Sequence, residues 1–296
     1  MDPGMGTETI HHDPEAPGSA PSESLITVVG VGYYPSHLTL EAICALEKAD
    51  VVIGHESLLS TLSTYIPSHA LQVSDPAIRE DTSDIEALKK ARVMQAIEYA
   101  QKGKKVVYIC PGDPGIYSYA QPILEWASSV PVKIIPGITA ALSAAAALGA
   151  PLRDGCAIIG LYEERVSPEI IQNRVTAAIQ ADFVMVLYLP KHEALLYPEF
   201  YPQHRYPELY PRESRCIERL QQTFEDLLAV RSPETPVGIL CIKGENELLS
   251  TTLGKYENVF EDILPYSTVI IGNSMSVYTG TYFVTSLWRE TNKSSK

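Results

Sequence analysis

The stretch Cys110-Pro111-Gly112-Asp113-Pro114-Gly115-Ile116-Tyr117 decides the fold of this chain. It follows Lys105-Val106-Val107-Tyr108-Ile109, whose apolar run predicts a buried parallel strand. It precedes a segment from Ser118 to Ala127 that we predict to be helical. The stretch is therefore a strand-to-helix loop at the carboxyl end of a strand, where open α/β sheets bind ligands. Its glycines allow the backbone to approach a ligand closely, and its prolines stiffen the loop.

Asp113 has two interpretations, which the spacing alone leaves open. An acidic residue in this loop cannot belong to a core without polar partners. It either acts on a bound ligand or caps the following helix in an ordinary tight turn.

Two motifs of the first half resemble those of the tetrapyrrole methylases, namely Gly112-Asp113-Pro114-Gly115-Ile116-Tyr117 and Pro136-Gly137-Ile138-Thr139-Ala140-Ala141. That family transfers a methyl group from S-adenosylmethionine to uroporphyrinogen, precorrins or diphthamide precursors. Three later motifs look most like the precorrin-3B C17-methyltransferases: Leu187-Tyr188, Thr235-Pro236-Val237-Gly238 and Ile270-Ile271-Gly272-Asn273-Ser274. The resemblance extends from Ile26 to Ser274, with a gap near residues 190–212.

Length and composition set the broad class. The chain has 296 residues, enough for two domains of ordinary size, and its formal net charge is −13. No basic face is visible, which argues against a nucleic-acid partner. No apolar run is long enough to span a membrane, and no secretory signal is recognisable. Five scattered cysteines without a CxxC pair indicate reduced thiols, a cytoplasmic location and no metal site.

The order of apolar segments predicts an α/β fold. Strands alternate with helices in the first half, which implies a parallel sheet covered by helices. The resemblance implies two α/β domains of the tetrapyrrole methylase type, with the donor site in the cleft between them. We predict a disordered leader at 1–24, an N-terminal domain at 25–150 and a C-terminal domain at 151–290. The Tyr- and Pro-rich segment 190–212 is a lid, a partner-binding arm or an ordinary insertion.

The individual elements follow from periodicity and capping residues. We predict a long amphipathic helix at 84–101, with Ile85, Leu88, Ala91 and Ala96 facing inward. Further helices are predicted at 139–148, 167–180 and 213–230. Strands are predicted at 25–29, 50–54, 105–109, 132–135, 156–161, 183–189, 236–242, 249–253 and 267–271, with an edge strand at 278–285.

The loop after the first strand tests for a dinucleotide site. Gly30-Val31-Gly32 is followed by tyrosines and Pro35, so the third glycine of the Rossmann fingerprint is missing and we do not predict NAD. In the tetrapyrrole methylases this loop reads Gly-x-Gly-Pro-Gly and faces the acceptor. Tyr33 and Tyr34 replace the Pro-Gly pair here. They are predicted either to stack on a macrocycle or simply to fill the loop.

The resemblance also implies the donor site, in which backbone groups bind S-adenosylmethionine between the two domains. The residues at matching positions are Pro111, Gly112, Asp113, Ile116, Tyr117, Thr139, Ala140, Tyr188, Ile242 and Thr268. The family usually forms homodimers, so a homodimer is expected.

The chemistry that the resemblance implies needs alignment more than acid–base catalysis. A sulfonium methyl group is already electrophilic, and a reduced tetrapyrrole carbon is the nucleophile. A general base would assist any proton loss, and His37 and Asp113 are the candidates, with Glu163 behind them. Precorrin carboxylates require cations, and Arg153, at the expected hinge, is favoured over Arg165, Lys191 and Lys243.

The leading hypothesis is therefore a methyltransferase that acts on precorrin-3B or its cobalt counterpart, with methylation at C17 and ring contraction in cobalamin biosynthesis. A sister methylase that acts on another carbon or scaffold is the first alternative. A non-catalytic binding protein with the same fold is the second.

Overall fold

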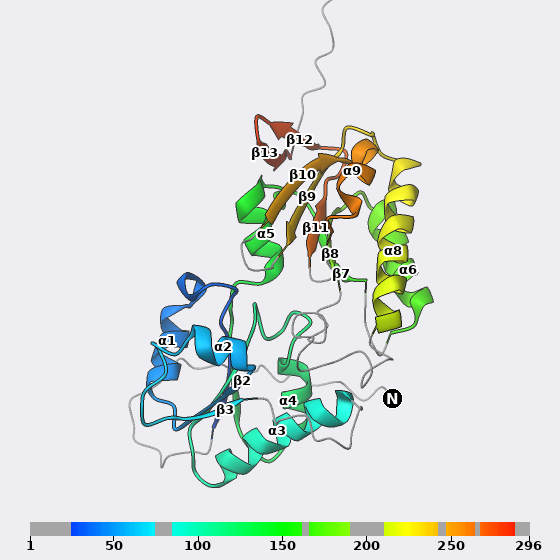
Figure 1. The fold of residues 1–296 in the computed structure, drawn as a ribbon. Coiled ribbons are helices and arrows are strands. Elements are labelled where there is room, and N and C mark those ends of the chain that lie inside the picture. Colours follow the sequence, from blue (N-terminus) through cyan, green and yellow to red (C-terminus); the bar gives the residue numbers. More distant parts are fainter. Residues whose placement is uncertain are drawn as a thin grey trace, which may run out of the picture.

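The protein consists of two lobes, each built on a five-stranded sheet (Figure 1). The structure is a computed structural model that describes residues 25–74, 85–161, 166–189, 210–241, 247–263 and 267–287. The predicted leader 1–24 lies outside the described residues, as do residues 190–209 of the predicted insertion 190–212, whose last three residues instead begin a helix at Tyr210.

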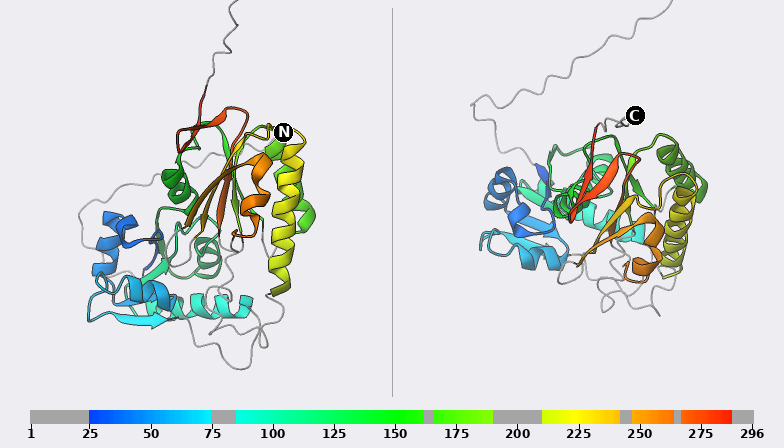
Figure 2. Two further views of the ribbon diagram at one scale, coloured as in Figure 1. Left: turned by 45° about the horizontal axis from the view of Figure 1, so that its top comes forward. Right: turned by 90° about the horizontal axis from the view of Figure 1, so that it is seen from above.

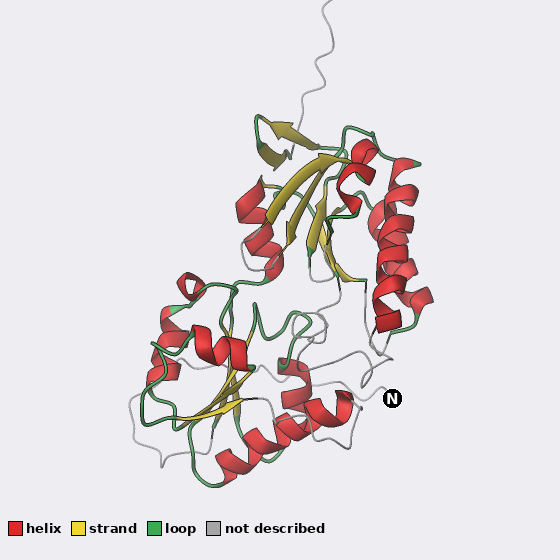
Figure 3. Cartoon of the chain, in the orientation of Figure 1, coloured by secondary structure: helices red, strands yellow, loops and turns green. Residues whose placement is uncertain are grey.

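The first sheet is parallel throughout and has the strand order β3-β2-β4-β1-β5. Its strands are β1 (Ile26–Gly30), β2 (Val51–Gly54), β3 (Leu71–Ser74), β4 (Val106–Cys110) and β5 (Val132–Ile135). Helices α1 (Leu40–Glu47) and α2 (Glu56–Thr61) cover one face, and α3 (Ile85–Gln101) and α4 (Ala120–Trp126) cover the other (Figure 3). Because both faces are covered, every residue of β1 and β4 is buried.

The second sheet is mixed and has the order β10-β9-β11-β8-β7. Its strands are β7 (Cys156–Gly160), β8 (Val184–Tyr188), β9 (Pro236–Cys241), β10 (Glu247–Thr252) and β11 (Thr268–Ile271). Helices α6 (Pro168–Gln180) and α8 (Tyr210–Leu228) pack side by side on one face, and α5 (Ala140–Leu148) packs on the other (Figure 2). A 3-10 turn η2 (Leu253–Lys255) and α9 (Glu257–Phe260) follow β10.

A third, small sheet corrects one prediction. The single edge strand predicted at 278–285 is a hairpin of β12 (Ser276–Thr279) and β13 (Tyr282–Thr285), and β13 also pairs with β6 (Gly149–Ala150). The chain reverses at Gly280, whose φ of +61° favours glycine.

Capping side chains explain where two helices begin. Thr39 accepts a hydrogen bond from the Ala42 amide at 3.1 Å at the start of α1. Ser167 accepts one from the Ile170 amide at 3.4 Å, and Pro168 takes the first position of α6, as predicted. The inward prediction holds for Ala96 of α3 but is wrong for Ala91, which is exposed.

Helix α5 belongs to the second lobe by its packing. Ala141, Ala144 and Leu148 contact Val186 of β8 and Ile270 of β11 in one hydrophobic cluster. The predicted division at residue 150 places this helix with the first half of the chain. The change from one core to the other instead occurs in the segment between β5 and α5, at residues 136–139.

Candidate functional site

Three loops meet at the carboxyl edge of the first sheet, after the neighbouring strands β4, β1 and β5. The loops after β1 and β4 are joined by a pair of backbone hydrogen bonds. The Gly32 amide donates to the Gly112 carbonyl at 3.2 Å, and the Gly112 amide donates to the Gly32 carbonyl at 3.0 Å. The stretch that begins at Pro111, a half-buried residue, is therefore held in register with the first loop.

Close backbone contacts bring in the third loop. A Cβ atom added at Gly137 would lie 2.2 Å from the Gly112 carbonyl oxygen, and one at Gly30 would lie 2.5 Å from the Gly137 amide nitrogen. No side chain fits between these loops, so glycine is required for them to pack backbone against backbone.

The Asp113 carboxylate joins two of the loops. Its Oδ1 accepts a hydrogen bond from the Gly115 amide at 2.8 Å, and its Oδ2 accepts one from the Gly137 amide at 3.0 Å. Both oxygens thus bind backbone groups of the site. In this geometry Asp113 positions the two loops, and its predicted role as a general base stays a prediction.

The second lobe contributes Tyr188 at the end of β8. Its hydroxyl oxygen accepts a hydrogen bond from the Ala141 amide at 2.8 Å and lies 2.6 Å from Thr139 Oγ1. It therefore takes the place of an N-cap for α5, since the Thr139 side chain does not cap this helix. Burial raises the pKa of Tyr188, so its hydroxyl is protonated at neutral pH.

The structure brings most of the predicted donor residues together. Thr139 and Ala140 adjoin Tyr188, and Thr268 is its partner in the β8–β11 ladder. Ile116 packs against the same cluster. Ile242 lies outside the described residues, as do Glu163, Arg165, Lys191 and Lys243.

Tyr33, predicted to bind the acceptor, packs with these residues instead of standing free. A Cβ atom added at Gly112 would lie 3.4 Å from Tyr33 Cε2 and Oη and 3.5 Å from Thr139 Cα. Burial raises the pKa of the Tyr33 hydroxyl. The ring of Tyr34 is half-buried and meets His37 edge-on, with ring centroids 4.7 Å apart. Both rings pack within the loop in this structure, and stacking on a bound macrocycle stays a prediction.

His37 lies in the short 3-10 helix η1 (Pro35–His37), packed over Gly32. Its Nδ1 faces the Tyr33 amide at 3.5 Å, a long hydrogen bond in which the ring nitrogen accepts. Burial lowers the pKa of His37, which favours the neutral ring. Because the neutral ring then carries its proton on Nε2, the expected proton-accepting role is not supported by this arrangement.

Arg153 is not at the hinge. It is exposed and precedes β7, whose far end, Gly160, contacts the first lobe through Tyr117. A five-residue strand separates the two positions by about 16 Å. The predicted hinge position of Arg153 is wrong because residues 149–150, just before it, pair with β13 at the other end of the second lobe.

Another arginine lies at the carboxyl end of β7. Arg219 of α8 is half-buried, and its Nη1 donates a hydrogen bond to the Leu161 carbonyl at 2.7 Å. This bond uses one of the five N–H groups of the guanidinium. No sequence signal points to Arg219, because the helical pattern around it is that of an ordinary amphipathic helix.

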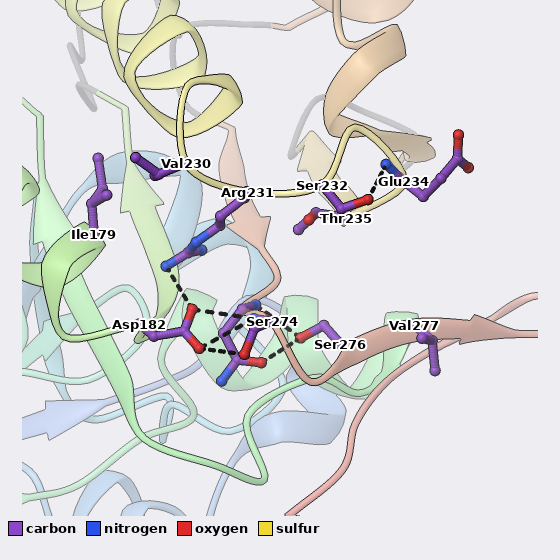
Figure 4. Close-up of a pocket in the computed structure, with 11 residues that line it drawn as sticks. Ile179, Asp182, Val230, Arg231, Ser232, Glu234, Thr235, Ser274, Ser276 and Val277 are labelled. Atoms are coloured by element: carbon purple, nitrogen blue, oxygen red, sulfur yellow. Dashed lines mark hydrogen bonds and ion pairs between the residues drawn. The ribbon is translucent and has the colours of Figure 1, made fainter. Parts of the chain in front are cut away.

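A cavity of about 490 Å³ lies at the opposite end of the second lobe (Figure 4). Arg231, only 4% exposed, donates to the carbonyls of Phe183 and Gly272 and pairs with Asp182 at 3.6 Å. Asp182 also accepts hydrogen bonds from the amide and hydroxyl of Ser274. These polar groups bind one another and hold the turns at this end of the sheet, so we interpret the network as structural.

The described residues contain no helix of the length and apolarity that a bilayer crossing requires. They also contain no cluster of three or more residues of the metal-ligand types His, Cys, Asp and Glu.

Comparison with known proteins identifies relatives over most of the chain. Residues 25–240 match the family model of the Tetrapyrrole (Corrin/Porphyrin) Methylases. A probable cobalt-factor III C(17)-methyltransferase of Salmonella typhimurium is 32% identical over 262 residues, which cover 84% of this chain and 92% of that protein. The cobalt-factor III methyltransferase of Priestia megaterium is 29% identical over 261 residues, which cover 84% of this chain but 42% of that longer protein.

Solved structures share the fold. The methyltransferase CobJ superposes with a TM-score of 0.66 at 24% identity, over 88% of this chain and 99% of that chain. A uroporphyrin-III C-methyltransferase from Thermus thermophilus, in complex with S-adenosyl homocysteine, gives 0.54 at 18% identity, over 83% and 96% of the two chains.

Proposed function

The chain belongs to the tetrapyrrole (corrin/porphyrin) methylases, and we propose that it methylates C17 of cobalt-factor III or precorrin-3B with S-adenosylmethionine as the donor. The relative that the chain matches over 92% of its length supports this choice of acceptor, and its name places the methyl group on C17. We further propose that ring contraction accompanies the transfer, in cobalamin biosynthesis.

The site has the character that such a donor requires. The proposed site consists of the loop Gly112–Tyr117 and the small residues at the start of α5, and a Cβ atom added at Gly112 would contact Tyr33 and Thr139 at 3.4–3.5 Å. We propose that these groups, with the hydroxyl of Thr139, hold the donor. The likeness to a family structure complexed with S-adenosyl homocysteine supports the same donor class.

The chain's own residues act mainly by alignment. When bound, the donor supplies an electrophilic methyl group on sulfur. Asp113 fixes the loops after β4 and β5 relative to each other, and the Thr139–Tyr188 pair fixes the second lobe against them. Holding two reactants in line lowers the activation free energy by up to about 7–11 kcal/mol.

The test is mass spectrometry of the pigment after incubation with donor carrying a ¹³C-methyl group and, in separate reactions, cobalt-factor III or precorrin-3B. We expect one labelled methyl group in a ring-contracted product, at C17 by ¹³C NMR. Asp113→Ala serves as the control for contaminating activity, because it releases both backbone amides and should abolish transfer.

The departures at Tyr33 and Tyr34 favour a second candidate, a sister methylase that acts on another carbon or scaffold. A labelled methyl group at a different carbon, or transfer to uroporphyrinogen III alone, would support the sister methylase. If the protein binds S-adenosylhomocysteine but transfers no methyl group to any of these acceptors, the hypothesis of a non-catalytic binding protein would remain. On the basis of the family resemblance, we also propose that the protein is cytoplasmic and forms a homodimer. Light scattering on the purified protein measures its molar mass and so tests the dimer.

A further inference from the structure

Tyr117 crosses from the donor loop of the first lobe to the second lobe. Its hydroxyl accepts a hydrogen bond from the Gly160 amide at 2.9 Å and donates one to the Ile158 carbonyl at 3.4 Å. Its ring meets that of Tyr188 edge-on, with centroids 5.7 Å apart. One side chain therefore makes three contacts with strands of the other lobe.

The phenol binds the free edge of the second sheet. Among the residues that the structure describes, strand β7 is the last strand of that sheet and pairs only with β8. The Leu161 amide donates to the Tyr188 carbonyl, so odd-numbered residues face β8 and the even-numbered Ile158 and Gly160 face outward. Tyr117 thus binds two edge groups that no described strand pairs with, which suits them to a contact between lobes.

Tyr117 has a strained backbone conformation and a closely packed ring. Its backbone φ is +51°, a left-handed value that is uncommon outside glycine. A Cβ atom added at Gly160 would lie 2.9 Å from Tyr117 Cε1, so only glycine at 160 allows the ring to approach β7. Strain that surrounding contacts hold in place is characteristic of functional sites.

We propose that Tyr117 is a positioning residue that holds the second lobe against the donor loop and so sets the distance between donor and acceptor. The proposal rests on the proposed function, because it takes the loop Gly112–Tyr117 as the donor loop. Asp113, four residues earlier, anchors that loop to the first lobe. The loop is therefore fixed at one end by a carboxylate and tied at the other to β7 by a phenol.

The kinetic test uses Tyr117→Phe, which keeps the ring and removes both hydrogen bonds. We expect kcat to fall about tenfold or more, because small misalignment of reacting groups is costly, while the donor KM changes less than about threefold. Gly160→Ala should give the same pattern from the other lobe. The double variant should be little worse than either single variant, because both changes break one contact. Tyr282→Phe, at an exposed tyrosine of β13, is the control.

A second measurement reports lobe position without turnover. Cys44 of α1 and Cys156 of β7 are exposed, whereas Cys110, Cys216 and Cys241 are buried, so spin labels attach to one site on each lobe of the native chain. We expect a single narrow distance distribution by pulsed electron paramagnetic resonance in the parent protein and in Tyr282→Phe. Tyr117→Phe and Gly160→Ala should give a broader and longer one.

The outcomes separate the two proposals. Unchanged distances in Tyr117→Phe, or a loss confined to donor KM, would overturn the positioning role even if methyl transfer is confirmed. Broadened distances in a protein that neither binds S-adenosylhomocysteine nor transfers methyl groups would uphold the contact between lobes and reject the proposed methyl transfer.

Discussion

Asp113 illustrates how one carboxylate can fix the spacing of two loops. A half-buried carboxylate loses part of its hydration, and two backbone amides compensate by donating one hydrogen bond to each oxygen. The two amides belong to different loops, so the same bonds that satisfy the charge also set the spacing of the loops. Loop spacing is therefore the property that substitution of Asp113 would change.

Substitution of His37 distinguishes a structural role from general-base catalysis at this residue. Because Nδ1 faces the Tyr33 amide, His37→Gln should retain an acceptor there and lower kcat less than about tenfold, measured from pH 6 to 8.5. Loss of a general base would instead cost about 10²–10⁴-fold. A drop in that range, with loss of the acidic limb of the pH profile, would restore His37 as the base.

The lowered pKa of His37 also predicts how stability depends on pH. Between its folded-state pKa and the usual value of 6.5, the unfolded chain binds more protons at this site than the folded one. His37 therefore makes stability fall as the pH drops through this window. Urea unfolding at pH 7.5 and 5.5 should show a smaller loss of stability for His37→Gln than for the parent protein.

Arg219 and Arg153 make a matched pair for acceptor binding. Arg219 lies at the end of β7 that contacts the first lobe, whereas Arg153 precedes the other end. We expect Arg219→Gln to raise the acceptor KM about tenfold with little change in kcat, as for loss of one charge-assisted hydrogen bond. Arg153→Gln should leave both constants unchanged. The reverse result would support the hinge position predicted from the sequence.

At the scale of elements, the site depends on how closely three loops approach. We predict that Gly30→Ala weakens binding of S-adenosylhomocysteine at least tenfold and destabilises the fold by about 1–3 kcal/mol, because its Cβ atom would lie 2.7 Å from the Gly112 carbonyl oxygen. Calorimetric titration and urea unfolding measure the two effects. In Gly115→Ala, in the loop after β4, the added Cβ atom meets only the Asp113 carboxylate at 3.3 Å, and this variant should retain binding. Equal losses in both variants would show that general loop disruption is responsible.

The sequence predicts regular elements well where a local cause acts. The bounds of β5 match the prediction, and α6 begins at the predicted Ser167-Pro168 cap, because strand alternation and capping depend on near neighbours. Elements α2 and β3 were missed, since the exposed residues of β3 give no buried pattern. The β12–β13 hairpin was missed because Thr279-Gly280-Thr281 lacks the Asn-Gly or Asp-Gly turn signal.

The site was predictable to a different degree. The family motifs led to Asp113, Thr139 and Tyr188, which the structure brings together. The contact between Tyr117 and Gly160 joins residues 43 positions apart, and the sequence around either residue does not predict it. The misplacement of Arg153 has the same origin, since the position of a loop depends on which sheet its neighbours join.

At the scale of the whole molecule, the chain changes lobes before α5. The loop after β5 therefore ends in a helix that packs on the second sheet, and Thr139 lies at the point of transfer. Residues of both lobes meet there, since the half-buried Tyr33 of the first loop packs against the cluster that contains Tyr188 of the second lobe. A ligand bound at this place contacts both lobes at once.

This arrangement predicts that donor binding protects both lobes against hydrogen exchange. At 100 times its dissociation constant, S-adenosylhomocysteine should stabilise the protein by about 2.7 kcal/mol. We expect slower exchange in the loop Gly112–Tyr117 and also at the carboxyl end of β8 near Tyr188, measured by mass spectrometry on peptides. Helix α3, on the far face of the first sheet, is the internal control. Protection limited to the first lobe would mean that the ligand binds the donor loop without engaging the second lobe, and that Tyr188 caps α5 with no part in donor binding.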